Sequence, residues 1–451
     1  MSDRVTPLEQ LGAFVVGLRA AQLPAPVRDK LKLHVADTIG AWVAAMATAE
    51  GRALLRFRES LQPGDTAPSL LDDVATNCAV TRLSEIDDIH LAAMITAGSI
   101  VVPGALTIAA SLQADGDELA AAIVGGYEAM IRLGLAIDGP TTLYRGIWPT
   151  YFATPFGIAA VAARLMGLDG RETAHALALA LTLASPGVGH HNAATTSRWF
   201  AVGNAARNGL TAAHAARAGF TSDLNMAGGF LANVYGLKPD VSRLNEGLGD
   251  DLALSHVSFK PWCAARQTMA AMQALKELIE AGLQSSEIEA IEAHVLPPHL
   301  KMIDHGVVAG DRASFLTSAQ YHLAMAALMP DAPASVGLPA GPPDNVRAMM
   351  ERITVMGDDA LLADYPEVWP ARVLVKTRKG THDLRVTHVP GDPARPFSSG
   401  DLERKFVRFV SPVFKGDVKD LFRRSLQVLN SGEAVTSLVE LLNETASRSS
   451  P

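Results

Sequence analysis

SEIDDIHLAAMITAGSIVVP, residues 84–103, sets acidic side chains directly before apolar sequence. Glu85, Asp87, Asp88 and His90 lie within six positions, and Leu, Ala, Met, Ile and Val follow them. Buried carboxylates are costly unless they are paired, and the places that hold them are where pKa values shift for chemistry. The stretch fits such a site. It also fits the solvated acidic end of a helix, in which Glu85 and Asp88 would share one face.

The composition indicates a well-buried globular protein. The chain has 451 residues, 48% of them apolar and 19% charged, which argues against disorder and predicts two or three domains. The net charge is −8 and no basic patch is present, so we expect no nucleic-acid partner. The acidic total does not exclude an anionic substrate, because local arginines decide that.

Cysteine usage and the distribution of apolar residues indicate the compartment. Two distant cysteines, Cys78 and Cys263, are too few for a disulfide framework or a cysteine metal site, and they suggest a reducing environment. The N-terminus has no apolar signal region. The uncharged run 91–114 contains Pro103 and two glycines, which predicts buried core and not a membrane span. We therefore expect a cytoplasmic protein with no membrane partner.

Helical signals occupy the first 266 residues. Thr6, Pro7 and Glu9 form the pattern of an N-cap, a first-turn proline and a capping box, which predicts a helix over 8–19. Apolar residues at helical spacing predict another over 27–46, where His34 and Asp37 would make a structural pair. Further helices, most of them alanine-rich, are predicted over 75–82, 106–112, 117–137, 150–166, 172–183 and 198–217.

The pattern changes after residue 266. Residues 288–295 alternate as a strand would, and 353–356, 371–377 and 382–387 are further strand candidates, the last two joined by a hairpin. Helices are expected over 268–281, 314–329 and 346–352, and again over 402–410, 419–429 and 435–442. The sequence predicts a mainly α fold. A large all-α domain, residues 1–266 and 396–451, would hold an inserted α+β lid, residues 267–395. The cleft between them would be the default binding site.

Motifs for phosphate, metal and nucleophilic chemistry are missing. There is no GxGxxG after a strand, no GxxxxGK[ST], no HExxH and no GxSxG. Adjacent side chains point apart, so His190 and His191 fit a structural or solvent-facing pair better than a metal-ligand pair. We expect neither a metal nor a cofactor.

Cationic residues beside aromatic ones suggest an anion site. Lys260 precedes Trp262, Arg266 follows soon after, and Arg198 precedes Trp199. A guanidinium offers a planar fork for a carboxylate, and a desolvated lysine can act as a base. Each also fits ordinary surface charge. Tyr144 and Tyr321 are possible hydroxyl donors or core residues.

The chain resembles the MmgE/PrpD family over nearly its full length. Several blocks carry the resemblance: ADTIG at 36–40, DD at 87–88 with GSIVVP at 98–103, WPT at 148–150, FGIAA at 156–160, LMGLD at 165–169, AARNG at 205–209, ARAGFT at 216–221, KP at 260–261, and KF at 405–406. The family includes 2-methylcitrate dehydratases, cis-aconitate decarboxylases and iminodisuccinate epimerases. The resemblance implies a helical domain holding an α+β lid, and a homodimer.

The resemblance also implies site residues. The catalytic candidates are Asp88, His90, Lys260 and Tyr321, and the substrate-binding candidates are Thr96, Tyr144, Arg198, Arg266 and Gln267. With them, residues 84–103 are expected to form one wall of the site.

Several positions depart from the family pattern. Thr96-Ala97 stands where the family usually has His-Pro, Trp148 replaces a histidine, and Arg198 replaces a lysine. Histidines that would act as acid or base are thus largely replaced. Expelling hydroxide needs a strong general acid, so this loss favours an epimerase or isomerase over a dehydratase.

The sequence therefore predicts a cofactor-independent acid/base enzyme on a small polycarboxylate or amino-acid-like acid. It would transfer a proton next to a carboxylate, as an epimerase or isomerase. A lyase resembling 2-methylcitrate dehydratase or cis-aconitate decarboxylase is the first alternative. A carboxylate-binding protein that has lost catalysis is the second.

Overall fold

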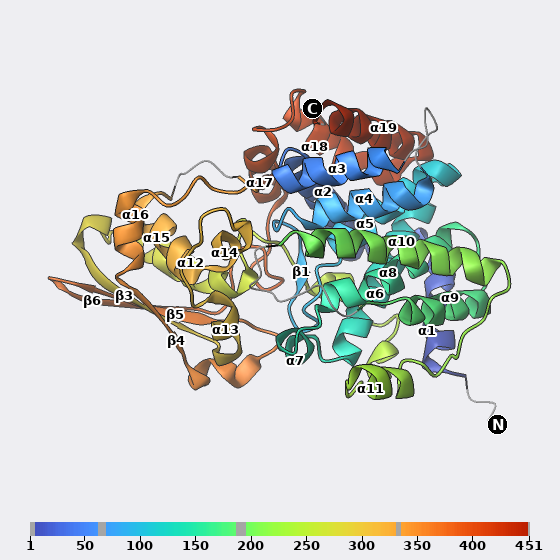
Figure 1. Cartoon of the computed structure of the whole chain (residues 1–451), viewed down its shortest axis with the longest axis horizontal. Coiled ribbons are helices and arrows are strands. Elements are labelled where there is room, and N and C mark those ends of the chain that lie inside the picture. The colour runs from blue at the N-terminus through green and yellow to red at the C-terminus, as the bar shows by residue number, and fades with distance from the viewer. Residues whose placement is uncertain (1–4, 62–68, 186–194, 331–334, 450–451) are drawn as a thin grey trace. The chain divides into compact units, whose positions relative to one another are not determined.

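The structure, a computed structural model, describes residues 5–61, 69–185, 195–330 and 335–449. The chain divides into two compact units (Figure 1). The helical unit comprises residues 1–189, 196–259 and 398–451, and the mixed unit comprises 190–195 and 260–397. The predicted limits of the lid, 267 and 395, lie inside the mixed unit. The fold is mainly α with one small inserted sheet, as the sequence predicts.

The helical unit is built from fourteen described α-helices and one two-stranded ribbon. The helices are α1 (Pro7–Gly17), α2 (Ala25–Met46), α3 (Ala49–Ser60), α4 (Leu70–Arg82), α5 (Gly98–Leu112), α6 (Gly116–Ala136), α7 (Gly139–Tyr144), α8 (Pro149–Leu165), α9 (Gly170–Thr182), α10 (Ser197–Arg217), α11 (Gly229–Tyr235), α17 (Ser399–Val410), α18 (Val418–Gln427) and α19 (Gly432–Ser449). The ribbon pairs β1 (Ile89–His90) with β2 (Val257–Ser258).

The centre of this unit is the packing of α8 against α6 and α10. Glycines let α6 and α8 approach closely: a Cβ on Gly126 would lie 2.6 Å from Val161, and one on Gly157 would lie 2.2 Å from Met130. Helix α6 is long and apolar enough to cross a membrane, but 94% of its most apolar window is buried inside the protein. Its composition is therefore explained by its place in the core.

The mixed unit is a four-stranded sheet with helices packed on it. The strand order is β4 (Ile353–Gly357), β3 (Ile288–Val295), β5 (Ala371–Thr377) and β6 (Gly380–Val386). Strands β3 and β4 are parallel, whereas β3–β5 and β5–β6 are antiparallel. The helices are α12 (Arg266–Glu280), α13 (Leu300–Ile303), α14 (Arg312–Thr317), α15 (Ala319–Leu328) and α16 (Asp344–Met350), and α12 packs against β3, β5 and β6.

Most predicted elements are confirmed, and the differences are local. Helix α5 begins at Gly98 and not near 106, and it continues through Pro103 at its sixth position, where the proline removes one intrahelical hydrogen bond. The predicted helix 314–329 is broken at Ser318, which leaves the helical backbone region and caps α15 through its hydroxyl. Helix α3, capped by Thr48, was not predicted, nor were the short helices α7, α11 and α13 or the β1–β2 ribbon.

Candidate functional site

The stretch between α4 and α5 is an irregular loop. It pairs with β2 through Ile89, and a backbone bridge from His90 to Ile95 closes it on itself. Glu85 and Met94 have positive φ angles, 58° and 55°. A positive φ angle in a residue other than glycine costs about 1–3 kcal/mol, and it persists only where the surrounding structure imposes it. Tertiary contacts therefore hold this loop in place.

The acidic residues of this loop are buried. Asp87 and Asp88 are each 0% exposed, so the solvated helix end expected as an alternative is wrong. The helical face that Glu85 and Asp88 would share does not form either, because residues 84–97 are not helical. The functional interpretation of the stretch remains.

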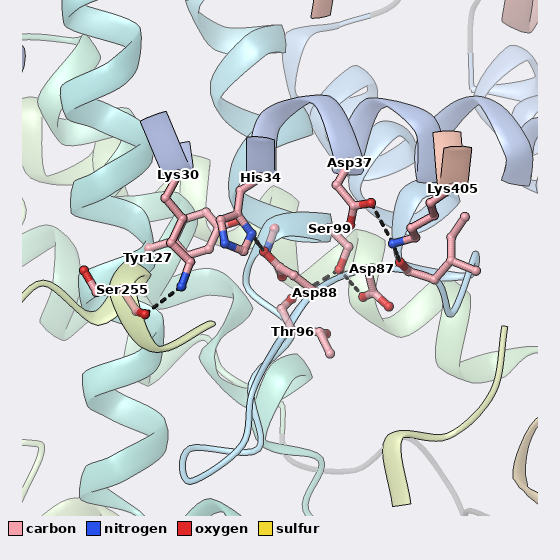
Figure 2. Close-up of polar contacts among 12 residues, drawn as sticks. Lys30, His34, Asp37, Asp87, Asp88, Thr96, Ser99, Tyr127, Ser255 and Lys405 are labelled. Atoms are coloured by element: carbon pink, nitrogen blue, oxygen red, sulfur yellow. Dashed lines mark hydrogen bonds and ion pairs between the residues drawn. The ribbon is translucent and has the colours of Figure 1, made fainter. Parts of the chain in front are cut away.

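Asp88 accepts hydrogen bonds from three separate elements (Figure 2). His34 Nδ1 on α2 lies 2.8 Å from its Oδ2, the Tyr127 hydroxyl on α6 donates to Oδ2 at 2.6 Å, and the Gly98 amide donates to Oδ1 at 2.8 Å. Burial raises the pKa of Asp88, but these hydrogen bonds outweigh it and bring the pKa below its usual value. Asp88 is therefore an ionised acceptor.

His34 is the functional candidate that the sequence analysis misjudged. It was expected to pair with Asp37, but its partner is Asp88. Its ring is 0% exposed and stacks on Phe259 at a centroid distance of 4.2 Å. Burial lowers the pKa of His34, despite the hydrogen bond to Asp88, so the ring is neutral. The sequence signal was a histidine at a core position of an apolar helix; its partner, 54 residues away, could not be seen.

Asp37 makes a separate buried ion pair. Lys405 on α17 lies 2.6 Å from the Asp37 carboxylate and also donates to the Ile86 carbonyl at 2.7 Å. Burial raises the pKa of Asp37 to about 6, and Lys405 opposes the rise. This lysine thus joins the C-terminal helices to the loop that carries Asp88.

Arg82 and Ser99 hold the other end of the acidic cluster. Arg82 Nη1 lies 3.1 Å from Glu85 and 3.4 Å from Asp87. The Ser99 hydroxyl donates to Asp87 at 2.7 Å. Asp87 is therefore held by charge pairing and hydrogen bonding at the start of α5, which fits a structural role.

Lys30 and His90 lie beside this cluster. Lys30, one turn before His34 on α2, donates to the Ser255 carbonyl at 2.6 Å, and desolvation lowers its pKa to about 8 while Asp88 opposes the change. His90 Nδ1 accepts a hydrogen bond from the Ala93 amide. Burial, together with nearby His256 and Lys30, lowers the pKa of His90 to about 3, so His90 is neutral.

Two substrate-binding candidates of the helical unit, Thr96 and Arg198, meet the start of α8. Thr96 binds Thr150 on α8 through both its amide and its hydroxyl. Arg198 is 7% exposed and its guanidinium lies 5.1 Å from the Trp148 ring centre, a cation–π contact. Tyr144 is half-buried at the end of α7. The burial expected for Arg198 is thus present.

The candidates of the mixed unit lie before α12, at its start and on α15. Arg266 is 2% exposed and donates through Nη2 to both oxygens of Asp392, at 2.9 and 2.8 Å. Its buried Nε and Nη1 have no hydrogen bond to any residue that the structure describes. Lys260 and Gln267 are buried, at 2% and 8% exposure. Tyr321 is half-buried, and burial raises the pKa of its hydroxyl.

The described part of the chain contains no cluster of side chains arranged to bind a metal ion. No group of three or more His, Cys, Asp or Glu side chains there is placed to hold an ion. His190 and His191 lie outside the described residues. The acidic cluster of residues 85–88 is paired with Arg82, His34 and Tyr127 instead.

Comparison with known proteins places this geometry in a family. The MmgE/PrpD N-terminal domain matches residues 9–236, and the MmgE/PrpD C-terminal domain matches residues 262–430. The chain belongs to the MmgE/PrpD family. The N-terminal match spans the Asp88 loop with its α2 and α6 partners, and the C-terminal match spans Arg266 and Tyr321.

Two fungal proteins are similar to the chain over part of its length. A cis-aconitate decarboxylase-like protein, oryM, of Aspergillus oryzae is 27% identical over 234 residues, 47% of this chain and 47% of that protein. Cis-aconitate decarboxylase of Aspergillus terreus is 30% identical over 219 residues, 45% of this chain and 44% of that protein. The chain therefore matches a little under half the length of each relative.

Proposed function

We propose that this member of the MmgE/PrpD family is a lyase-type enzyme that transfers a proton next to a carboxylate of a small di- or tricarboxylic acid. The observation that carries the proposal is Asp88: a fully buried, ionised carboxylate, fixed by three donors on a loop with strained backbone. Such a group costs stability, and perturbed buried groups of this kind cluster at functional sites. The names of both fungal relatives support the substrate class.

Arginines would hold the substrate. Nε and Nη1 of Arg266 have no hydrogen bond to a described residue, and each could donate one hydrogen bond to a substrate carboxylate. Arg198 would bind a second carboxylate. Charge that develops on the enolate-like intermediate would be stabilised by these cations, and Lys260 would exchange a proton with the substrate.

The outcome of the proton transfer divides the proposal in two. A lyase would either expel an oxygen leaving group from the anion or form the anion by loss of CO₂ and then protonate it; the names of the relatives suggest the second course. An epimerase or isomerase would return the proton, and the replacement of family histidines by Thr96 and Trp148 favours this second form.

Ligand binding and proton exchange test the proposal directly. Cis-aconitate, citrate, 2-methylcitrate and tartrate would be screened by thermal shift, because a ligand of the folded state raises the melting temperature with concentration. Each hit would then be incubated with enzyme in D₂O and followed by ¹H NMR. We expect loss of a C–H signal next to a carboxylate, with or without release of CO₂.

The role of Lys260 is tested in the same assay. Lys260→Met should slow the exchange by about 10²–10⁴-fold, the usual contribution of a positioned acid or base. Unchanged exchange would remove Lys260 from the mechanism. Binding of acids without exchange in the wild-type protein would replace the proposed enzyme by a carboxylate-binding protein.

A further inference from the structure

We propose that His34 is the catalytic residue that takes the proton in this reaction, and that Asp88 is the positioning residue that prepares it. The inference rests on the proposed function and assigns the chemical step within it. It gives Asp88 a different role from the one expected from the sequence, and it makes His34 the group that removes the proton, with Lys260 as the second group of the exchange.

The hydrogen bonds of Asp88 make it a poor proton acceptor. Its Oδ2 accepts from His34 and Tyr127, and its Oδ1 accepts from the Gly98 amide. Three of the roughly four acceptor positions of the carboxylate are thus occupied. A Cβ on Gly98 would lie 2.7–2.8 Å from both oxygens, so the backbone is tight against the carboxylate on this side. Asp88 is built to stay ionised and to accept hydrogen bonds.

The same contacts determine which nitrogen of His34 is basic. An ionised carboxylate only accepts, so Nδ1 must carry the hydrogen of the 2.8 Å bond to Asp88. Because the ring is neutral, the lone pair then lies on Nε2. This is the arrangement in which a carboxylate holds an imidazole in the tautomer needed for general-base catalysis.

Nε2 of His34 makes no hydrogen bond that would stabilise the described fold. It is buried and has no hydrogen bond to any residue that the structure describes. Leaving a buried acceptor unsatisfied costs about 1–3 kcal/mol, which an apolar residue at this helix position would avoid. The arrangement is explained if Nε2 is reserved for a substrate proton.

The surroundings of the ring suit an anionic acid. Figure 2 shows the ring between the Asp88 carboxylate and the Lys30 side chain. Lys30 lies on the same face of α2, one turn before His34, and interacts electrostatically with His34 and Asp88. Phe259 stacks on the flat face of the ring and immediately precedes Lys260 in the chain.

The step balances as a simple proton transfer. The Nε2 lone pair forms an N–H bond with the hydrogen on the carbon next to the substrate carboxylate, and the C–H bond breaks. Its electron pair stays on the substrate as an enolate-like anion, and His34 becomes an imidazolium facing Asp88. Exchange of that imidazolium proton with D₂O, followed by return to carbon, gives the deuterium incorporation measured above.

Two substitutions separate the roles of the pair. In His34→Asn the side-chain amide still places an N–H near Asp88, but no group replaces Nε2. In Asp88→Asn the amide group donates to Nδ1 and forces the hydrogen onto Nε2. Each should reduce the rate of exchange from cis-aconitate by about 10²–10⁴-fold, and the double variant should lose little more than either one. His175→Asn on α9 is the matched control. His175 accepts a hydrogen bond from the Ser222 amide and has no described hydrogen bond with the Asp88 cluster, so this variant should keep the wild-type rate of exchange.

A spectroscopic measurement tests the geometry without substrate. In ¹⁵N-histidine-labelled protein, the signal absent from His34→Asn identifies the ring. We expect protonated Nδ1 and unprotonated Nε2 in the wild type, and the reverse in Asp88→Asn. An unchanged tautomer in that variant would show that Asp88 does not set the protonation of the ring, and would overturn its positioning role.

The outcomes distinguish this inference from the proposed function. Wild-type exchange that survives in a folded His34→Asn protein would overturn the inference and leave the function standing. A wild type that exchanges no acid would remove the function and with it the catalytic half of the inference. A protonated Nε2 in the wild type would overturn the inference whatever the activity.

Discussion

Removing Lys405 should destabilise the helical unit by leaving the Asp37 carboxylate buried and unpaired. The two side chains are 6% and 3% exposed, and their charged atoms lie 2.6 Å apart. Breaking a buried ion pair by removing one partner costs about 3–5 kcal/mol. Lys405→Met also loses the 2.7 Å bond to the Ile86 carbonyl, so we expect the upper half of that range at pH 8.

The pH dependence makes this prediction specific. Burial raises the pKa of folded Asp37 to about 6, above its usual 3.8, so the folded state binds the proton more tightly than the unfolded state. The contribution of Asp37 to stability therefore falls as pH rises from about 4 to 6. In Lys405→Met that pKa rises further, and the fall continues to higher pH. The difference between the two proteins should be large at pH 8 and small at pH 5, where Asp37 is protonated in both.

The assay is urea unfolding followed by far-UV circular dichroism at pH 5 and pH 8. Lys32→Met is the control on the same helix, because Lys32 makes only an exposed 3.8 Å pair with Asp29 and should change stability by less than about 1 kcal/mol. Asp37→Asn/Lys405→Met, which removes both charges, should recover part of the loss. A loss below about 1 kcal/mol, or an equal loss at both pH values, would refute this account of the pair.

Three further predictions concern the Asp88 cluster. Gly98→Ala places a methyl group 2.7–2.8 Å from both Asp88 oxygens and should abolish proton exchange while far-UV circular dichroism stays close to wild type; normal exchange would show that the close approach is dispensable. Tyr127→Phe removes one hydrogen bond to Asp88, whose folded pKa is lowered, and should raise that pKa. Acid unfolding should then begin at a higher pH than in the wild type, and an unchanged midpoint would contradict the assigned bond. Lys30, with its pKa lowered to about 8, should react with acetic anhydride with a midpoint near pH 8 in peptide mapping, whereas a midpoint near 10 would place it in open solvent.

Local signals were sufficient for most of the fold. The capping box of Thr6 and Glu9 predicted the start of α1, alternation over 288–295 predicted β3, and the hairpin pattern predicted β5 at 371–377. These features depend on neighbours within a few positions, where propensity and periodicity operate. Differences arose at Pro103 and Ser318, where one residue in a helical pattern can either be tolerated or end the helix.

The site depended on contacts that no local pattern contains. The sequence by itself singled out residues 84–103 as an acidic stretch entering the core, and it pointed to Asp88 within it. Only the tertiary structure decided that Asp88 accepts hydrogen bonds from α2, α5 and α6, and that His34 and Asp37 take partners 54 and 368 positions away. The physical reason is that burial and hydrogen bonding set the charge of a titratable group, and both are fixed by residues that chain folding brings together from distant positions.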